Sequence, residues 1–367
     1  MIASGAAVSL GYISGTLARI PVLGAGLALR AAAATVDWMG RLKISDTRVA
    51  NPELWVAVLA GSALVVAMIL ARRRAVWAGI GLLGVGRGAA IWISVVPPPA
   101  QFRLMALEVT AVDVGQGDSI LVVTPQGRTI LIDAGGLPSW MHSDLDIGED
   151  VVSPYLWSRG ISRLDAVAIT HAHADHIGGM SAVLANFRPR QLWLGVDSPS
   201  PELQLVLQEA KSIGIPMVLH FAGERFEMGG ATVRILAPVA GSESQLSRPN
   251  DTSLVMKISY EAISALLEGD AEQKEENLIS QENPAADLLK VAHHGSATST
   301  AEDFLAAVHP RYAVISVGAR NVYGHPRQEV LERLAHARID TYRTDKNGAI
   351  SFYLDGRNVM PEVLVLH

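Results

Sequence analysis

Three histidines and one aspartate lie within six residues, in the run HAHADH: His171, His173, Asp175 and His176. The run follows the apolar segment LDAVAIT, whose composition is typical of a buried strand. Gathering these polar groups beside a buried strand costs free energy unless they share a cation. Nitrogen and carboxylate ligands suit Zn, Mn or Fe. The spacing therefore indicates a metal site at which His171 and His173 approach one ion while Asp175 and His176 approach another.

Other predicted strands also end in side chains that can ligate a metal or contact a substrate. AISALLEGD ends at Asp270, a carboxylate that can bridge two cations, and DLLKVA is followed by His293 and His294. One of these two histidines is expected to complete the second metal site, and the other to support it or contact substrate. The Gly-flanked loop SVGARNVYGHP adds Asn321, Tyr323 and His325. Alone, each residue has a structural explanation, and their recurrence at successive strand ends favours one shared site.

The elements that position these residues follow from short apolar runs bounded by Gly, Asp and Pro. Eleven runs predict strands: LEVTAVDV, SILVVTP, TILIDAGG, LDAVAITH, QLWLGV, TVRILAP, SLVMKIS, AISALLEGD, DLLKVAHHG, YAVISVG and AISFYL. Six stretches between them predict helices: residues 151–159, 178–186, 201–213, 271–281, 301–307 and 328–336. Strands interspersed with helices favour layered sheets covered by outer helices.

HAHADHIGG resembles the HxHxDH signature of the metallo-β-lactamase fold, and LIDAG, LLEGD and KVAHHGS accompany it. With DVGQGDSILV, NDTSLVM and NVYGHP, the pattern resembles the hydrolase domain that ends the ComEC-family competence channels, which carry transforming DNA across bacterial membranes. The likeness covers about residues 104–367 and, more loosely, the last membrane helices before them. It implies an α/β protein with a metallo-β-lactamase αββα sandwich, preceded by an α-helical transmembrane region over residues 1–100. The family's N-terminal OB-type domain and most of its channel helices are missing here, so we expect a truncated product, a fragment or a reduced relative.

The resemblance also implies roles for individual residues. The first metal site is expected to use His171, His173 and the bridging Asp270, and the second Asp175, His176, Asp270 and one of His293 and His294. The histidine that the family usually carries before SLVM is replaced here by Asn250 or Asp251, which leaves the first site weaker or richer in oxygen. Supporting or substrate-binding roles are expected for Asp118, Asp133, Asn250, Asp251, Ser296 and Tyr323. Asp133 is expected beside the ligands, and Asp118 within hydrogen-bonding reach of a ligand histidine.

The first hundred residues have a different composition. Residues 54–71 carry no charge and approach the length that crosses a bilayer. Arg72, Arg73 and Arg74 end this segment, and residues 75–96 form a second apolar stretch interrupted by Arg87. Residues 1–29 are a third apolar stretch, for which a signal peptide is the alternative. We expect two to three membrane helices, and the alternative for the two clearest is a buried helical hairpin in a soluble protein.

Charge divides the chain in the same way. Up to Leu104 there are ten basic and three acidic residues, a net charge of +7, whereas the remainder has 20 basic and 33 acidic residues, a net charge of −13. A cytoplasmic turn at residues 72–74 follows the positive-inside rule and sends the hydrolase domain to the outer side of a bacterial cell membrane. Basic residues before the first span (Arg41, Lys43 and Arg48) favour the opposite orientation.

The predicted function is phosphodiester hydrolysis of DNA during competence-type uptake, with two divalent ions, Zn or Mn, activating water. Asp175 is expected to accept a proton, and His325 and Asn321 to stabilise charge on the phosphate. The expected partners are DNA, membrane lipid and other DNA-uptake proteins. Because the chain has no cysteine, thiol nucleophiles, disulfides and cysteine-ligated zinc are excluded.

The net charge of −13 opposes binding of a polyanion, because nucleic-acid-binding proteins usually carry a basic surface. A first alternative is therefore a hydrolase of small substrates: a cell-envelope phosphodiester, a lactone or a thioester. A second is a transport subunit that binds DNA without cutting it.

Overall fold

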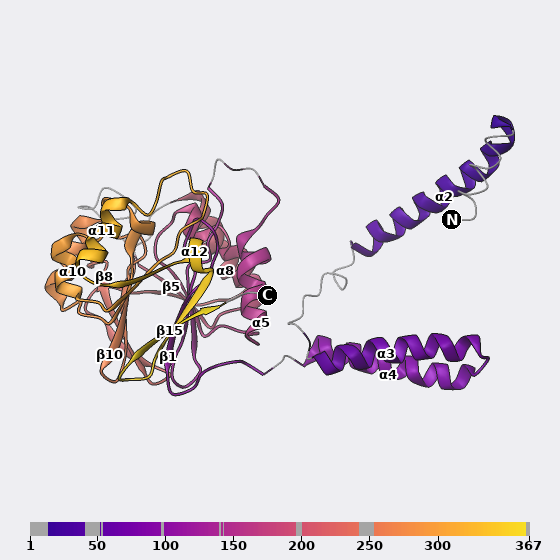
Figure 1. The fold of residues 1–367 in the computed structure, drawn as a ribbon, viewed down its shortest axis with the longest axis horizontal. Coiled ribbons are helices and arrows are strands. Elements are labelled where there is room, and N and C mark those ends of the chain that lie inside the picture. The colour runs from indigo at the N-terminus through magenta and orange to yellow at the C-terminus, as the bar shows by residue number, and fades with distance from the viewer. Residues whose placement is uncertain are drawn as a thin grey trace. The chain divides into compact units, whose positions relative to one another are not determined.

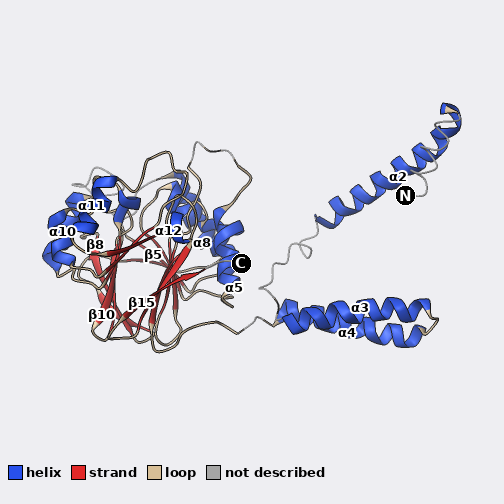
Figure 2. Cartoon of the chain, viewed as in Figure 1, coloured by secondary structure: helices blue, strands red, loops and turns tan. Residues whose placement is uncertain are grey.

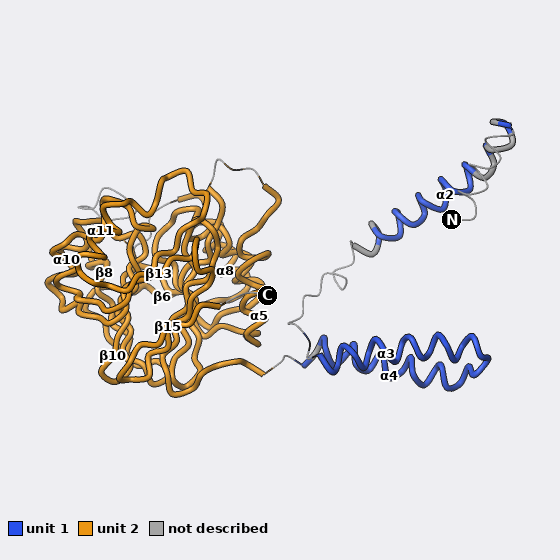
Figure 3. The backbone as a smooth tube through the Cα atoms, in the orientation of Figure 1, with its two compact units in different colours: residues 1–97 blue, residues 98–367 orange. Residues whose placement is uncertain are grey.

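The computed structural model describes residues 14–40, 52, 54–96, 99–138, 141, 143–195, 200–241 and 253–364. The chain divides into two compact units, residues 1–97 and residues 98–367 (Figure 3). The predicted boundary, between residues 100 and 104, lies within a few residues of this division.

The first unit is helical. It contains α2 (Gly15–Gly40), α3 (Leu54–Arg72) and α4 (Val76–Val95) (Figure 1). α3 and α4 form a hairpin that is closed by a hydrogen bond from the Ala75 N–H to the Leu70 carbonyl. The two helices approach closely through small residues: Ala63 and Ala67 are buried, and a Cβ added at Gly79 would lie 3.4 Å from the Ala67 carbonyl oxygen. Contacts of this kind are typical of helix pairs in membranes.

α3 and α4 correspond to the two clearest predicted spans and differ from them by one residue at their ends. Both are long and apolar enough to cross a membrane, judged by length and composition. Only 17% and 11% of their apolar windows are buried, whereas the core helix of a soluble protein would be mostly buried. Arg87 is exposed on this hairpin.

The second unit contains two sheets. The eight-stranded sheet has the order β15 (Val359–Leu364), β14 (Ala349–Leu354), β1 (Leu107–Ala111), β2 (Ile120–Val123), β3 (Thr129–Ile132), β4 (Ala166–Ile169), β5 (Gln191–Leu194), β6 (Met217–Leu219). The seven-stranded sheet has the order β13 (Asp340–Arg343), β12 (Tyr312–Ile315), β11 (Leu288–Lys290), β10 (Ile263–Leu267), β9 (Val255–Tyr260), β8 (Ala231–Ala237), β7 (Arg225–Met228). Strands β3 to β6 run parallel to one another, as do β10 to β13, and the other pairs are antiparallel.

Helices cover the outer face of each sheet. The longer ones are α5 (Ser153–Ser158), α7 (Met180–Phe187), α8 (Pro201–Ser212), α9 (Gln273–Ile279), α10 (Glu302–Val308) and α11 (Gln328–His336). The shorter helical segments are η2 (Gly148–Val152), α6 (Ala174–Ile177), η5 (Ser280–Glu282), η6 (Ala292–Gly295) and α12 (Thr344–Asn347). Figure 1 shows α5 and α8 on one side of the sheets and α10 and α11 on the other, with the strands between them in Figure 2.

Three apolar cores hold these layers together, because alternate side chains of a strand point to opposite faces. Val109 of β1 and Val233 of β8 pack in the core between the two sheets. Leu121 of β2 packs with helices α5, α7 and α8, and Leu289 of β11 packs with α9, α10 and α11. The layer order is therefore helix, sheet, sheet, helix, and the predicted αββα sandwich is confirmed.

Each of the eleven runs predicted as strands overlaps an observed strand, and each of the six stretches predicted as helices overlaps an observed helix. The majority of the observed ends differ from the predicted ends by no more than two residues. Four strands were not predicted: β6, β7, β13 and β15. β6 has only three residues, β7 and β13 contain few apolar residues, and β15 contains Pro361. Each lies at or next to the edge of its sheet, where a strong apolar pattern is not needed.

Glu276 of α9 holds the turn that begins α10. Its carboxylate accepts hydrogen bonds from the backbone N–H groups of Thr300 and Ala301, the second at 3.1 Å. Burial nevertheless raises the pKa of Glu276 from 4.5 to about 7. Since the folded pKa exceeds the unfolded one, Glu276 contributes stability that is fully present below the unfolded pKa and is lost as the pH rises through 7.

We therefore expect Glu276→Gln, which stays neutral, to lose less stability than the wild type between pH 5 and pH 8. The difference should be on the order of 1–3 kcal/mol in the unfolding free energy. Urea unfolding at both pH values in EDTA measures it, with the exposed Glu302→Gln as control. Equal pH dependence in wild type and Glu276→Gln would contradict the assignment.

Candidate metal centre

The predicted site residues meet where strands of the two sheets end. His171 comes two residues after β4, Asp270 three residues after β10, and His293 and His294 three and four residues after β11. Because β10 and β11 are parallel, their carboxyl ends lie at the same edge of the sheet. The Leu254 N–H donates to the carbonyl of Thr170, which links this edge to the end of β4.

Close backbone contacts hold the turn that carries the first histidines. His173 is the residue before α6, and Asp175 and His176 lie within that helix. The Asp175 carbonyl accepts the N–H of Asp118 at 3.1 Å. Gly117 has a φ of +140°, and any Cβ there would overlap the Asp175 carbonyl oxygen. Only glycine permits this approach, which fixes the GQGD segment against the histidine turn.

Asp270 lies at the centre of the cluster and is 2% exposed. Its carboxylate oxygens lie 3.2 Å from Nε2 of His176, 3.8 Å from Nε2 of His171, 3.8 Å from Nε2 of His293 and 3.9 Å from Nε2 of His294. Four imidazoles from two strand ends therefore converge on one buried carboxylate.

Asp133 orients the ring of His176 by contacting its Nδ1, on the side away from Asp270. Its Nδ1 lies 2.7 Å from Oδ2 of Asp133, which also accepts a hydrogen bond from the Thr170 hydroxyl. A carboxylate on Nδ1 leaves Nε2 free to face the centre, an arrangement common behind metal-ligating histidines. The structure thus places Asp133 beside the cluster, where the resemblance implied a supporting residue.

Of the two histidines after β11, His294 is the one that approaches Asp175. Its Nδ1 contacts the Ser316 carbonyl oxygen at 2.9 Å, and its Nε2 lies 3.3 Å from Oδ2 of Asp175. His293 instead approaches Glu272, with Nδ1 3.5 Å from Oε1.

The backbone is strained at three of these positions. Asp133, His293 and His294 have φ angles of +59°, +50° and +54°. A left-handed conformation is unfavourable for such residues and persists where the surrounding structure imposes it, often at functional sites. Here it turns both histidine side chains toward the cluster.

Four groups of side chains have ligand atoms within 4.8 Å of one another among the described residues. Two of them consist of predicted ligands: His171, His176 and Asp270 in one, and Asp175, His176 and His294 in the other. The other two groups include Asp118. The first two groups differ from the predicted ones, in which His171 was grouped with His173. His173 lies beside them, with its ring centroid 4.5 Å from that of His171.

The electrostatics of the cluster favour a positive charge at its centre. Burial and the neighbouring His176 hold the pKa of His171 well below its usual value, so this ring is neutral. Burial would also lower the pKa of His176, but Asp270 and Asp133 outweigh it and raise that pKa well above its usual value. Burial would raise the pKa of Asp270, but His176 and His294 hold it well below the usual range.

Buried polar atoms without hydrogen-bond partners indicate whether the cluster could bind a cation. Nε2 of His171, His176 and His294 and Oδ1 of Asp270 are buried and have no hydrogen-bond partner among the described residues. Buried polar atoms are normally hydrogen-bonded, so four unpartnered ones facing each other indicate a missing ligand. The donors are imidazole nitrogens and carboxylate oxygens, which fit Zn, Mn or Fe.

The site predicted from the sequence did not include Lys290. This lysine is 1% exposed and forms an ion pair with Asp118, next to the cluster of histidines. Its ammonium also donates to the Gly269 carbonyl at 2.9 Å. Asp118 in turn lies 3.6 Å from Nδ1 of His294 and 3.9 Å from Nδ1 of His176. A lysine inside the apolar run DLLKVA was the signal for this pair.

A cavity of about 320 Å³ opens onto the cluster and is lined by His173, Asp175, Asp270, His293, Tyr323 and His325, among others. The ring of His325 lies 5.7 Å from that of His293. Burial, with the nearby His294 and His293, lowers the pKa of His325 to about 4. His325 is therefore neutral at physiological pH and can donate one ring N–H to a ligand in the cavity.

The structure gives two other predicted residues, Asn321 and Ser296, a different setting. The Asn321 amide donates to the Gly318 and His325 carbonyls, and its Oδ1 accepts the His325 N–H. All three contacts stay within the loop, so Asn321 fixes the position of His325. The Ser296 hydroxyl pairs with Thr298. Asn250 and Asp251 lie outside the described residues.

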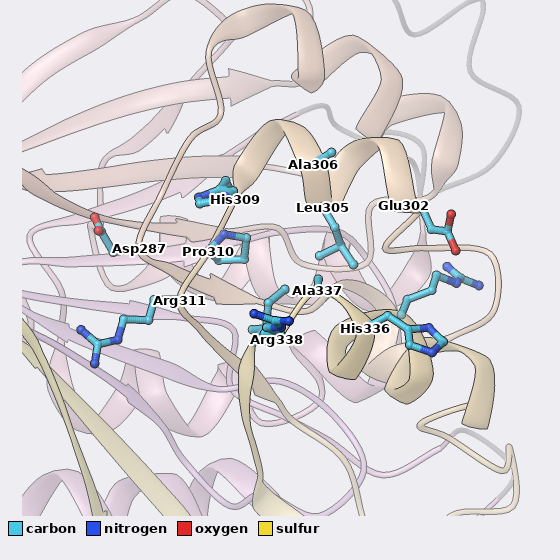
Figure 4. A pocket seen from close by; sticks show the side chains of 12 residues that line it. Asp287, Glu302, Leu305, Ala306, His309, Pro310, Arg311, His336, Ala337 and Arg338 are labelled. Carbon is cyan, nitrogen blue, oxygen red and sulfur yellow. The ribbon is translucent and has the colours of Figure 1, made fainter.

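A larger cavity, about 730 Å³, lies elsewhere (Figure 4). Its lining includes Asp287, Arg311 and Ile339, which directly precede β11, β12 and β13. The metal-centre residues follow the opposite ends of these parallel strands, so this cavity is separate from the candidate site.

Comparison with known proteins bears on the family. A profile of the Metallo-beta-lactamase superfamily matches residues 112–319, more than half of the chain. The chain is 36% identical over 261 residues to ComE operon protein 3 of Bacillus subtilis (68% of this chain, 33% of that protein). It is 33% identical over 251 residues to Competence protein ComA of Neisseria gonorrhoeae (67% and 32%).

The chain therefore spans about a third of the length of these curated relatives. Among solved structures, the metallo-beta-lactamase fold protein YhfI from Bacillus subtilis is 13% identical with a TM-score of 0.46, covering 67% of this chain and 99% of its own. The matched residues include the histidine turn, Asp133, Asp270 and both histidines after β11. The chain belongs to the metallo-β-lactamase superfamily and, with these competence proteins as homologues, to the ComEC family.

Proposed function

We propose that residues 98–367 form a metal-dependent phosphodiesterase that cleaves DNA. The observation that carries this proposal is the set of buried, unpartnered nitrogen and oxygen atoms around Asp270, together with the cavity that Asp270 and His294 line. Relatives named as competence proteins support DNA as the substrate.

Two divalent ions, Zn or Mn, would be held by the side chains that converge on Asp270. The proposed ligands are His171, His173, Asp175, His176, Asp270 and His294, with His293 at the rim. When bound, such ions lower the pKa of water and so supply a nucleophile at neutral pH.

The remaining steps belong to the chain's own residues. Asp175 is held ionised against the effect of burial, with its pKa lowered by His294, and can accept the proton of the attacking water. His325 donates a hydrogen bond to a phosphate oxygen, which stabilises the charge that develops there. Asn321 holds the loop that carries His325.

We also propose that α3 and α4 anchor the chain in a bacterial cell membrane as part of a DNA-uptake system. The positive-inside rule assigns Arg72, Arg73 and Arg74 to the cytoplasmic side. α4 then leads outward, and the hydrolase domain meets incoming DNA outside the cell.

The test uses the full chain, purified in detergent and loaded separately with Zn and Mn. We expect cleavage of DNA and of bis-p-nitrophenyl phosphate, and loss of both activities in EDTA. A protein that binds less than one ion per chain and cuts no DNA would be a non-catalytic DNA-binding subunit, and the proposal would fail.

A hydrolase of small substrates is a second candidate. The net charge of −13 after Leu104 favours it, because a long polyanion is repelled more strongly than a small ester. Faster hydrolysis of a lactone, a thioester or a small phosphodiester than of DNA at physiological salt would support this candidate.

A further inference from the structure

An apolar groove lies next to the metal-centre cavity. It has a volume of about 420 Å³, and Leu145, Ile147 and Val322 contribute to its walls. Val322 is 72% exposed and Leu145 is 46% exposed. Exposed apolar side chains that cluster around a hollow usually mark a binding surface.

The groove and the metal-centre cavity adjoin each other. Gln116, Pro138 and Tyr323 line both of them. Tyr323 is 40% exposed, and its ring lies 5.9 Å from that of His325. A ligand held in the metal-centre cavity can therefore extend past Tyr323 into the groove.

The chemistry of the groove fits a flat, largely apolar ring attached to a phosphate. An aromatic side chain at the junction offers a stacking surface, and stacking of a base on such a ring contributes roughly 1–3 kcal/mol. Arg320 also lines the groove and can pair with a neighbouring phosphate.

We propose that this groove binds an unpaired nucleobase of the nucleotide whose phosphodiester lies at the metal centre. This inference rests on the proposed function and narrows its substrate class to single-stranded DNA or a frayed end. A base paired within a duplex would first have to leave its stack, which costs a few kcal/mol.

Two chromogenic esters that share one leaving group test the groove separately from the metal centre. Thymidine 5′-(p-nitrophenyl phosphate) carries a base, whereas methyl p-nitrophenyl phosphate does not. In both, water adds to phosphorus, the phosphorus–oxygen bond to p-nitrophenolate breaks, and the water proton passes through Asp175 to solvent. The full chain in detergent, loaded separately with Mn and with Zn, is used throughout.

We expect kcat/KM to be at least about tenfold higher for the thymidine ester, the effect of stacking one base. In the double variant Leu145→Ser/Val322→Ser, which keeps Tyr323, this preference should fall severalfold, since the apolar walls are lost. Leu205→Ser on α8 is the matched control, because Leu205 is also apolar and 65% exposed but lies outside the groove. It should keep the full preference.

Hydrolysis of both esters at equal kcat/KM by the wild type would overturn the groove assignment and leave the phosphodiesterase standing. Hydrolysis of neither ester with Zn or Mn would overturn both. A preference that persists in the double variant, with unchanged urea unfolding, would also refute the groove. As a second measurement, thymidine 5′-phosphate should inhibit methyl ester hydrolysis more strongly than inorganic phosphate, and equal inhibition would count against the groove.

Discussion

Asp270→Asn is expected to abolish hydrolysis and metal binding while the domain stays folded. The substitution keeps the shape of the side chain and removes the negative charge that four imidazoles face at 3.2–3.9 Å. An amide cannot replace a carboxylate shared by two cations. We expect kcat/KM to fall by roughly a thousandfold or more, about 4 kcal/mol in the activation free energy.

Three measurements check this result: metal content, hydrolysis of bis-p-nitrophenyl phosphate, and the urea unfolding midpoint. Asp287→Asn is the matched control, because Asp287 is a partly buried aspartate whose carboxylate accepts the Ser264 N–H at the opposite end of the same sheet. It should keep its activity and its metal. Full activity in Asp270→Asn would show that the reaction does not depend on this cluster.

His173→Ala separates the two ways of grouping the ligands. The resemblance makes His173 a ligand of the first ion, whereas the group that contains His171 and Asp270 has His176 in its place. If His173 is a ligand, the variant loses one of two bound ions and its activity. If it lies beside them, both ions remain and only kcat/KM falls. Metal content distinguishes the two outcomes.

The sequence predicts where the site lies better than how its side chains pair. His171, Asp270 and His294 each follow a predicted strand. Asp270 and His294 meet because β10 and β11 are parallel neighbours, whereas His171 follows β4 of the other sheet and joins them through the packing of the two sheets. The contacts of each side chain cannot be predicted in this way, since the direction of a side chain depends on local backbone such as the positive φ of His294. The apolar pattern also gave no reason for Asn321 to bond only within its own loop.

The strands at the sheet edges could not be predicted from the sequence either. A central strand such as β2 is buried on both faces, and its sequence is therefore a continuous apolar run, ILVV. β7 and β13 lie at a sheet edge and have the sequences RFEM and DTYR, whose pairing depends on tertiary contacts. Lys290 shows the opposite deviation: it is a charged residue within a buried strand, and its burial is possible because it forms an ion pair with Asp118.

Lys290→Met is expected to cost about 3–5 kcal/mol of unfolding free energy, the usual effect of removing one partner of a buried ion pair. Lys290 and Asp118 are 1% and 2% exposed in their side chains, so solvent screens neither charge. Burial would lower the pKa of Lys290, but Asp118 and Asp270 raise it above its usual value, so the ammonium is charged. Methionine fills the same space and leaves the Asp118 carboxylate buried without its counter-ion.

Urea unfolding in EDTA measures this cost without any contribution from bound metal. The double variant Lys290→Met/Asp118→Asn should recover part of the loss, because no unpaired charge then remains, and the double-mutant cycle gives the coupling between the two residues. Lys346→Met, at an exposed lysine of α12, should change stability by less than about 1 kcal/mol. A Lys290→Met protein as stable as the wild type would contradict the assignment of Lys290 and Asp118 as a stabilising buried ion pair. The histidines that also approach Asp118, His176 and His294, would then be sufficient to offset its charge.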